Sequence, residues 1–407
     1  MGLPEKREFI GVREMPISGN VSRSMEEGSW IRRMFEVGIA MKSEYGVDKV
    51  FDLSLGNPIV EPPSIFKEEL INFAQSLDTG RHRYMPNAGY PETRASVANM
   101  LSNETGLGFT QNDIVMACGA AGAANVVLRT ILNPGDEVII LAPYFGEYVY
   151  YIDNHRGVPI VVDTTQEFQL NIDSIREAIS ERTRAIIINS PNNPSGAIYP
   201  DEDLSSLCSL LYQKQDEYGT EIFIISDEPY RRLIYDGLTY PQVFPHYGNT
   251  IIVNSHAKDL GLPGERIGYI AVHPSYGDKE ELVDGFIFCT RTLGFVNAPA
   301  LMQHVVKTLQ GLTVDVAEYQ RKRDYLYNSL TDLGYSVIKP QGAFYLFPKS
   351  PLDDDVSFVD VLQEWKVLTV PGKGFGTPGH FRISYCVEDW VLEGAVQGFA
   401  QAADKFL

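Results

Sequence analysis

One lysine and one arginine lie close together in a glycine-rich segment, and their chemistry suits an aldehyde that carries a phosphate. Lys258 follows an apolar run, and Arg266 comes eight residues later, with Gly261, Pro263 and Gly264 between them. A lysine forms an imine only when its amine can be neutral, which requires a partly desolvated or cationic environment. Arginine suits phosphate because its planar guanidinium donates paired, charge-assisted hydrogen bonds. The pair therefore predicts an aldehyde cofactor joined to Lys258 and held by Arg266.

A short run of small residues, 119–122, follows the apolar run 114–118 and opens a predicted helix. The backbone N–H groups of Gly119, Ala120 and Ala121 could then face a phosphate, helped by the helix dipole. The same small residues would also suit close packing, so this signal is weak by itself.

Three other features place polar groups on or directly after apolar runs. Asp227 follows the run 223–226, where an aspartate could equally cap a helix. The loop 190–196 consists of residues that form turns in any case. Arg382 stands on an otherwise apolar strand pattern, and a buried arginine requires an anion, which a substrate or a structural salt bridge could supply.

Taken together and in this order, these segments resemble those of fold-type I pyridoxal-phosphate (PLP) enzymes, specifically the aspartate aminotransferase-like class I aminotransferases. The resemblance extends from about Ser54 to Cys386. It implies a transaminase whose PLP rests as an imine on Lys258. The freed lysine would then act as the general base and acid that moves the α-proton.

The resemblance also assigns roles around the cofactor. Asp227 matches the aspartate that keeps the pyridine nitrogen protonated, so that the ring withdraws electrons from a carbanion. Tyr230 and Asn193 match the residues that hydrogen-bond the phenolic oxygen, and Phe145 matches the aromatic residue that stacks on the ring. The phosphate would be held by Ser255, Arg266 and the backbone of Gly119, Ala120 and Ala121. Ala257 stands where many members have a second serine, and the resemblance assigns no role to His256.

For the substrate, the resemblance implies that Arg382 clamps the α-carboxylate, with Gly56 and Asn193 beside it. Tyr84 matches a tyrosine that reaches the phosphate in the neighbouring subunit, which would make the protein a homodimer with a shared active site. A tyrosine in a polar loop is the alternative for Tyr84. Lys258, Asp227 and Tyr230 are the predicted catalytic residues, and no metal is expected.

The substrate pair is left open by the sequence. We expect an aspartate- or alanine-type amino acid and a 2-oxo acid such as 2-oxoglutarate. A dicarboxylic substrate would need a second cation, for which Arg291, Arg32 and Arg33 are candidates, although each is more commonly a surface charge. Two alternatives are a PLP-dependent C–S β-lyase and a noncatalytic PLP-binding regulator. The second is disfavoured because the region before residue 50 is not basic and shows no helix-turn-helix pattern.

Most of these residues follow predicted strands, as ligand-binding residues do in open α/β sheets. Near-continuous apolar runs predict buried strands, and amphipathic stretches between them predict helices. The strands are expected at 138–141, 159–162, 185–188, 223–225 and 251–253, and the helices at 120–132, 172–180 and 201–218. The fold class is therefore α/β, with a large PLP-binding domain over residues 50–297 built on a mostly parallel mixed sheet between helices.

A smaller α+β domain is expected from residues 1–49 and 298–407, the N-terminal part being assigned by the resemblance. Residues 298–333 show a long helical pattern. Strands are expected at 335–339, 343–347 and 380–385, and helices at 358–365 and 387–406.

Composition excludes several other classes of protein. The net charge of −19 disfavours nucleic acid and anionic membranes as partners. The four cysteines are scattered without metal-binding spacing, which fits a reducing compartment. Residues 1–8 are charged and precede no apolar core, so we expect no signal peptide. No apolar run is long enough to span a bilayer, and we expect a cytoplasmic protein.

Overall fold

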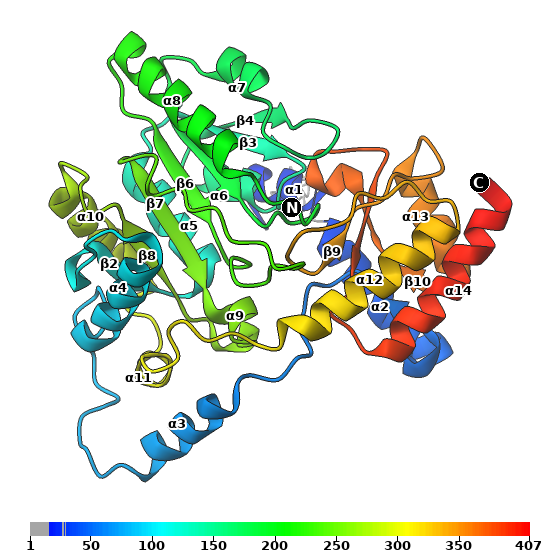
Figure 1. The fold of residues 1–407 in the computed structure, drawn as a ribbon, viewed down its shortest axis with the longest axis horizontal. Coiled ribbons are helices and arrows are strands. Elements are labelled where there is room, and N and C mark those ends of the chain that lie inside the picture. Colours follow the sequence, from blue (N-terminus) through cyan, green and yellow to red (C-terminus); the bar gives the residue numbers. More distant parts are fainter. Residues whose placement is uncertain (1–15, 27, 29) are drawn as a thin grey trace, which may run out of the picture.

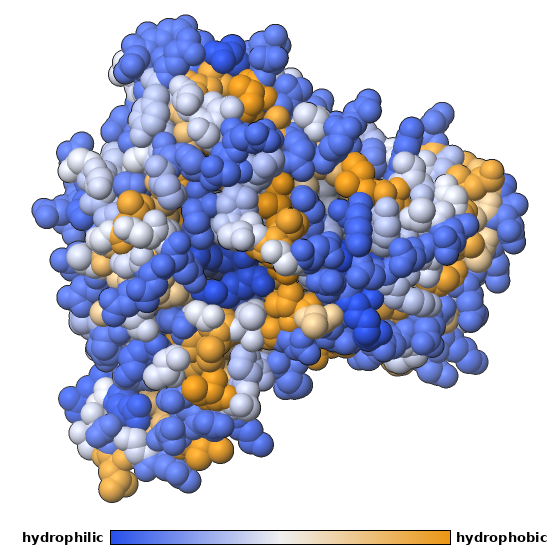
Figure 2. All heavy atoms as spheres, in the orientation of Figure 1, coloured by the Kyte–Doolittle hydropathy of each residue, from blue (hydrophilic) through white to orange (hydrophobic). Residues whose placement is uncertain are grey.

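The computed structural model describes residues 16–26, 28 and 30–407. Residues 1–8, for which we expected no signal peptide, lie outside this range. None of the described helices is both long and apolar enough to cross a membrane. Figure 2 shows that hydrophilic side chains cover most of one face of the molecule.

A mixed sheet of seven strands forms the centre of the larger part of the molecule (Figure 1). Its spatial order is β2 (Ile114–Ala117), β8 (Gly268–Val272), β7 (Thr250–Ser255), β6 (Phe223–Asp227), β5 (Thr183–Asn189), β3 (Glu137–Ala142) and β4 (Val158–Asp163). Only β8 runs antiparallel to its neighbours, and the other pairs are parallel. The sheet confirms the predicted α/β fold class, and all five predicted strands of this sheet are present.

Helices cover both faces of this sheet because alternate strand residues enter separate hydrophobic clusters. Ile140 and Ile225 point toward α5 (Gly119–Ile131), α6 (Tyr148–Asn154) and α10 (Lys279–Thr292). Ile139 and Ile224 point the other way, toward α7 (Ile172–Ala178) and α8 (Asp201–Tyr218). Near β2 and β8 that second face is covered by α4 (Pro91–Thr105) and α11 (Ala300–Val306). Burial on both faces explains why these strands read as continuous apolar runs.

The smaller part of the molecule has two short sheets and a core of its own. One antiparallel sheet has the order β11 (Val370–Pro371), β12 (Phe381–Ser384) and β9 (Tyr345–Leu346). A parallel pair joins β1 (Phe51–Asp52) to β10 (Val367–Leu368). Around them lie α2 (Trp30–Tyr45), α12 (Val316–Asp332), α13 (Asp355–Glu364) and α14 (Asp389–Phe406). Residues near both ends of the chain share this core, since Met34 and Leu53 pack in the same cluster as Phe381.

The other α-helices of the described residues are α1 (Gly19–Glu26), α3 (Ser64–Gln75) and α9 (His256–Asp259). The domain boundaries near residues 50 and 298 stay a prediction.

The prediction of one long helical stretch over 298–333 is wrong, because residues 307–315 separate α11 from α12. Gly311 has a φ of 90°, which a helix does not allow. The Val314 N–H donates to the Asp259 carbonyl at 2.7 Å, and Asp315 caps α12 by accepting from the Ala317 N–H. The interruption thus ties this segment to the turn that carries Lys258.

The strand predicted at 335–339 is also absent, although Ala343–Phe347 contains the two-residue strand β9. Tyr335 instead packs against Phe358 and Phe399, and its hydroxyl donates to the Phe399 carbonyl at 2.9 Å. Side-chain packing, rather than a ladder of backbone hydrogen bonds, explains the apolar pattern here.

Candidate active site

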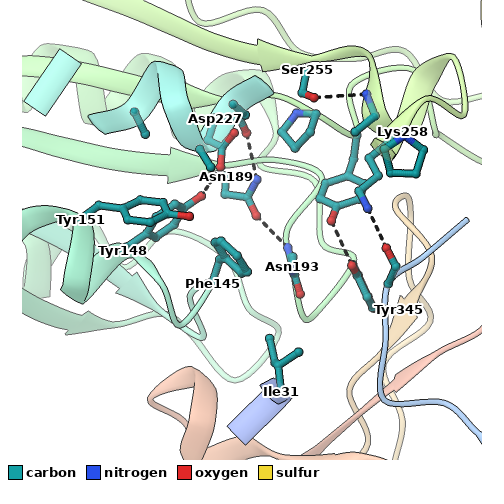
Figure 3. A pocket seen from close by; sticks show the side chains of 18 of the residues that line it. Ile31, Phe145, Tyr148, Tyr151, Asn189, Asn193, Asp227, Ser255, Lys258 and Tyr345 are labelled. Carbon is teal, nitrogen blue, oxygen red and sulfur yellow. Dashed lines mark hydrogen bonds between the residues drawn. The ribbon is translucent and has the colours of Figure 1, made fainter. Parts of the chain in front are cut away.

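The strand ends of the large sheet meet residues of the smaller part at a cavity of about 250 Å³ (Figure 3). Asn189, Asp227 and Ser255 are the last residues of β5, β6 and β7. Opposite them lie Tyr345 and Arg382, from β9 and β12. Of the predicted site residues, only Gly119 and Tyr84 do not line this cavity. Those that line it are Gly56, Ala120, Ala121, Phe145, Asn193, Asp227, Tyr230, Ser255, Lys258, Arg266 and Arg382.

Lys258 lies on α9, the single helical turn that follows β7. The Ser255 hydroxyl caps this turn by accepting from the Ala257 N–H at 3.2 Å. The Lys258 Nζ points into the cavity and donates to the Gly56 carbonyl at 2.6 Å. Burial, aided by the nearby Arg382 and Arg266 and opposed by Cys386, lowers the pKa of the amine to about 8. A substantial fraction of this lysine is therefore neutral near pH 8, as a nucleophilic amine requires.

His256 supports the same turn from outside the cavity. One ring nitrogen lies 3.2 Å from an Asp259 carboxylate oxygen, and the other lies 3.1 Å from the Gln310 amide nitrogen. The side chain is buried, so these contacts hold the lysine turn against the connection between α11 and α12.

Asp227 has one carboxylate oxygen bound and one oxygen left over. The Tyr148 hydroxyl donates to Oδ2 at 2.5 Å, whereas Oδ1 is buried and has no hydrogen-bond partner among the described residues. Burial raises the pKa of the carboxyl group to about 7, although the hydrogen bond from Tyr148 opposes this rise. A buried, unpaired oxygen beside the cavity fits a ligand that donates a hydrogen bond, such as the protonated pyridine nitrogen of PLP.

A second group of residues forms an anion cradle at the start of α5. Gly119 begins the helix with a φ of 71°, and a side chain there would lie 2.8 Å from Nη2 of Arg266. Arg266 itself has a φ of 51°, and its Nη1 donates to the Pro263 carbonyl at 3.1 Å. Helix N–H groups and a guanidinium therefore converge there, which fits the phosphate of PLP.

Arg382 is 1% exposed, yet its hydrogen-bond partners are neutral. Nη1 donates to the Asn193 amide oxygen at 3.1 Å, and Nη2 donates to the Ser54 carbonyl at 2.6 Å. The Nε–H has no partner, and none of the carboxylates in the described part of the chain forms an ion pair with this guanidinium. A buried cation without an anion is costly, so this geometry favours a bound carboxylate.

Several residues of the cavity were missed by sequence reasoning: Ile31, Tyr148, Tyr151, Asn189 and Tyr345. Tyr148 stands three residues after Phe145 at the start of α6, a spacing that could have indicated it. Asn189 was visible as the polar end of an apolar run, and its amide joins the Asp227 carbonyl to the Asn193 N–H. Ile31 and Tyr345 come from distant segments, and no local signal indicated them.

The candidates for binding a second carboxylate do not line the cavity. Arg32 pairs with Glu36 on the outside of α2, and the Arg33 guanidinium lies 4.8 Å from the ring of Trp30. Arg291 lies beside Phe288 on the exposed side of α10.

Tyr84 is 91% exposed and lies outside the cavity. It lines a separate hollow with Phe295 and Asn297. Its predicted role requires a second copy of the chain and stays a prediction.

Comparison with known proteins identifies the family of this chain. Residues 48–399 match the family model described as aminotransferase class I and II. The chain is 35% identical to the aspartate/prephenate aminotransferase of Thermus thermophilus, over 88% of this chain and 92% of that protein. It is 32% identical to a probable aspartate aminotransferase of Methanocaldococcus jannaschii, over 85% of this chain and 91% of that protein.

Solved structures agree as well. An aminotransferase from Eubacterium rectale superimposes with a TM-score of 0.92 at 38% identity, covering 96% of this chain and 99% of that one. The aspartate aminotransferase of Thermus thermophilus with maleate gives a TM-score of 0.82 at 29% identity, covering 95% and 100%. The chain therefore belongs to the class I and II aminotransferases, and it is a PLP-dependent transaminase of fold type I.

Proposed function

We propose that this enzyme moves an amino group between an aspartate- or alanine-type L-amino acid and a 2-oxo acid such as 2-oxoglutarate. The names of its relatives support an aspartate-type substrate, and they do not favour the C–S β-lyase or the noncatalytic regulator. The observation that carries the proposal is a set of buried polar atoms in one cavity that lack hydrogen-bond partners. Oδ1 of Asp227 and Nε of Arg382 are buried without partners among the described residues, and both residues line the same cavity as Lys258.

Each of these groups has a distinct task in the proposed reaction. When bound, PLP supplies an electron-withdrawing ring that stabilises negative charge at the substrate α-carbon. Asp227 holds the proton on the ring nitrogen, because its free oxygen can accept that hydrogen bond. Arg382 orients the substrate through its carboxylate. Lys258 takes the α-proton on Nζ and later returns it, which its lowered pKa allows near neutral pH.

The remaining residues hold the cofactor in position. Tyr230 and Asn193 would hold its phenolic oxygen, and Phe145 would pack against its ring. Ser255, Arg266 and the N-terminus of α5 hold its phosphate. Half of the residues that line the cavity are buried, which limits the access of water to Lys258.

A homodimer with a shared active site is part of the proposal. Helix α3 extends away from the body of the molecule and has no buried residue (Figure 1). Leu77, just after α3, is 96% exposed, and Tyr84 follows in the same arm. Such an exposed arm favours contact with a second copy, where Tyr84 would reach the partner's phosphate site. We also propose a cytoplasmic location, which the four unpaired cysteines support.

The test is stopped-flow absorbance of the PLP-loaded protein mixed separately with a panel of L-amino acids. Transamination predicts that the absorbance of the pyridoxal form converts to that of the pyridoxamine form and is restored by 2-oxoglutarate. The amino acid that converts fastest identifies the substrate. Accumulation of pyruvate and ammonia without this conversion would instead indicate the lyase, and absence of any cofactor band would overturn the role of Lys258.

A further inference from the structure

Tyr345 lines the cavity, and no predicted role explains its hydroxyl. Tyr345 lies on β9 of the small sheet and is 2% exposed. Its oxygen is 3.0 Å from the hydroxyl oxygen of Tyr230, which follows β6 of the large sheet (Figure 3). The adjacent strand, β12, pairs with β9 and carries Arg382. This hydrogen bond therefore joins the half of the cavity facing the substrate to the half facing the cofactor.

Glycine at position 56 makes room for this hydroxyl. A Cβ atom at Gly56 would lie 2.0 Å from the Tyr345 hydroxyl oxygen, so a larger residue would displace it. The Gly56 carbonyl also accepts the hydrogen bond from Lys258, and the Arg382 guanidinium lies 4.7 Å from the centre of the Tyr345 ring. Backbone, guanidinium and hydroxyl contacts thus restrict Tyr345 to one orientation.

The direction of the bond between the two hydroxyls follows from hydrogen counting. A phenol has one hydrogen to donate and lone pairs with which to accept. Burial raises the pKa of Tyr345 to about 12 and that of Tyr230 well above its ordinary value, so both hydroxyls keep their protons. If Tyr230 donates its hydrogen to the phenolic oxygen of PLP, then Tyr345 must donate to Tyr230. A hydroxyl that accepts a hydrogen bond becomes a stronger donor.

We propose that Tyr345 is a positioning residue that donates to Tyr230 and thereby strengthens and directs the hydrogen bond from Tyr230 to the phenolic oxygen of the cofactor. The inference rests on the proposed function of the cavity, since it takes Tyr230 to face that oxygen. A stronger donor stabilises negative charge on the phenolic oxygen. The nitrogen that joins PLP to Lys258 then loses its proton at a lower pH, and the reactive, unprotonated form is more populated.

Other charged or titratable groups act on the same two hydroxyls, and the experiment must hold them constant. Arg382 and Asp227 act on Tyr230, and Arg382 and Cys386 act on Tyr345. Replacing Tyr345 by phenylalanine keeps the ring that packs on Phe344 and Arg382 and removes only the hydroxyl.

The test is a pH titration of the visible absorbance of bound PLP in the wild type, Tyr345→Phe, Tyr230→Phe and the double variant. We expect the pH midpoint of the absorbance change to rise by about half a pH unit in Tyr345→Phe. This is the part of the strength of one hydrogen bond that we attribute to cooperativity. The midpoint of Tyr230→Phe should rise further. In the Tyr230→Phe background, loss of the Tyr345 hydroxyl should add no further shift, because Tyr345 acts through Tyr230.

Tyr335→Phe is the matched control, because Tyr335 is a buried tyrosine of the same part of the molecule whose hydroxyl donates to a backbone carbonyl away from the cavity. It should lower the unfolding temperature without moving the midpoint. An unchanged midpoint in Tyr345→Phe, or an equal shift in both backgrounds, would overturn the role of Tyr345. Failure of the wild type to bind PLP through Lys258 would instead overturn the proposed function, so the two failures are distinguishable.

Discussion

The two sides of the cavity are built from different kinds of structure. On the cofactor side, Asn189, Asp227 and Ser255 end three adjacent strands of a sheet that is buried on both faces. On the substrate side, Tyr345 and Arg382 lie on strands of two and four residues, and Gly56 lies in a loop. The first side is held by a continuous ladder of backbone hydrogen bonds across several strands, and the second by the short pairings of β9, β11 and β12 together with side-chain contacts among distant segments. We therefore expect the cofactor side to be the more rigid frame and the substrate side to be the part that adjusts to different amino acids.

The largest effect is expected at the centre of the rigid side, where Lys258→Ala removes both the covalent attachment and the proton-transferring amine. Amino transfer should fall by about 10⁴-fold or more, and PLP should bind only weakly and noncovalently. Single-turnover kinetics measure the rate of amino transfer, and the absorbance of the bound cofactor shows how PLP is held. A control, Lys279→Ala, removes a partly buried lysine that pairs with Asp113 outside the cavity, and it should retain activity. Normal transamination by Lys258→Ala would contradict the assignment.

On the substrate side, the next largest effect is expected for Arg382→Lys. The charge is retained, but a lysine cannot donate in the paired geometry that fits a carboxylate. We expect kcat/KM to fall by about 10²-fold, from the loss of one or two charge-assisted hydrogen bonds. The pH midpoint of the absorbance of the bound cofactor should change little. Steady-state kinetics with the best amino acid from the panel would measure the effect, and an unchanged KM and kcat would argue against a carboxylate clamp.

The difference between the sides also explains how far the sequence could predict them. Asp227, Asn193 and Lys258 follow apolar strands, and strand ends in a parallel sheet converge at one edge, so their meeting was predictable. Tyr345 could not be placed in this way, because its strand has only two residues and its partner Tyr230 is far away in sequence. The break between α11 and α12 was also missed because of a contact between distant segments. It depends on the backbone hydrogen bond between Val314 and Asp259.

A smaller effect is expected at Asp227, where a substitution should stabilise the protein when PLP is absent, whereas the preceding substitutions impair the enzyme. Its folded-state pKa, about 7, lies above the ordinary value of 3.8, so the folded protein binds a proton there that the unfolded chain has lost. Between these two values the stability of the cofactor-free protein should therefore fall as pH rises, by about 1.4 kcal/mol per pH unit from this group.

Asp227→Asn should remove this dependence and stabilise the cofactor-free protein at neutral pH, while it weakens PLP binding. Chemical denaturation at several pH values, with and without PLP, measures both effects. Equal pH dependence in the variant and the wild type would show that Asp227 is not the titrating group. Tyr148→Phe should extend the dependence to higher pH without moving its lower limit, because the hydrogen bond from Tyr148 lowers only the folded-state pKa of Asp227.

The smallest effect is expected at Ile31, the one residue of α2 that lines the cavity. In Figure 3 it lies across from Phe145 and Asn193, on the side away from Asp227. If the substrate side adjusts independently of the frame, Ile31→Ala should raise KM for the preferred amino acid by roughly tenfold through lost apolar contact, with little change in kcat. The affinity for PLP and the absorbance midpoint should stay those of the wild type. A shifted absorbance midpoint in Ile31→Ala would mean that the two sides are coupled. A change on the substrate side would then reach the cofactor despite the continuous sheet.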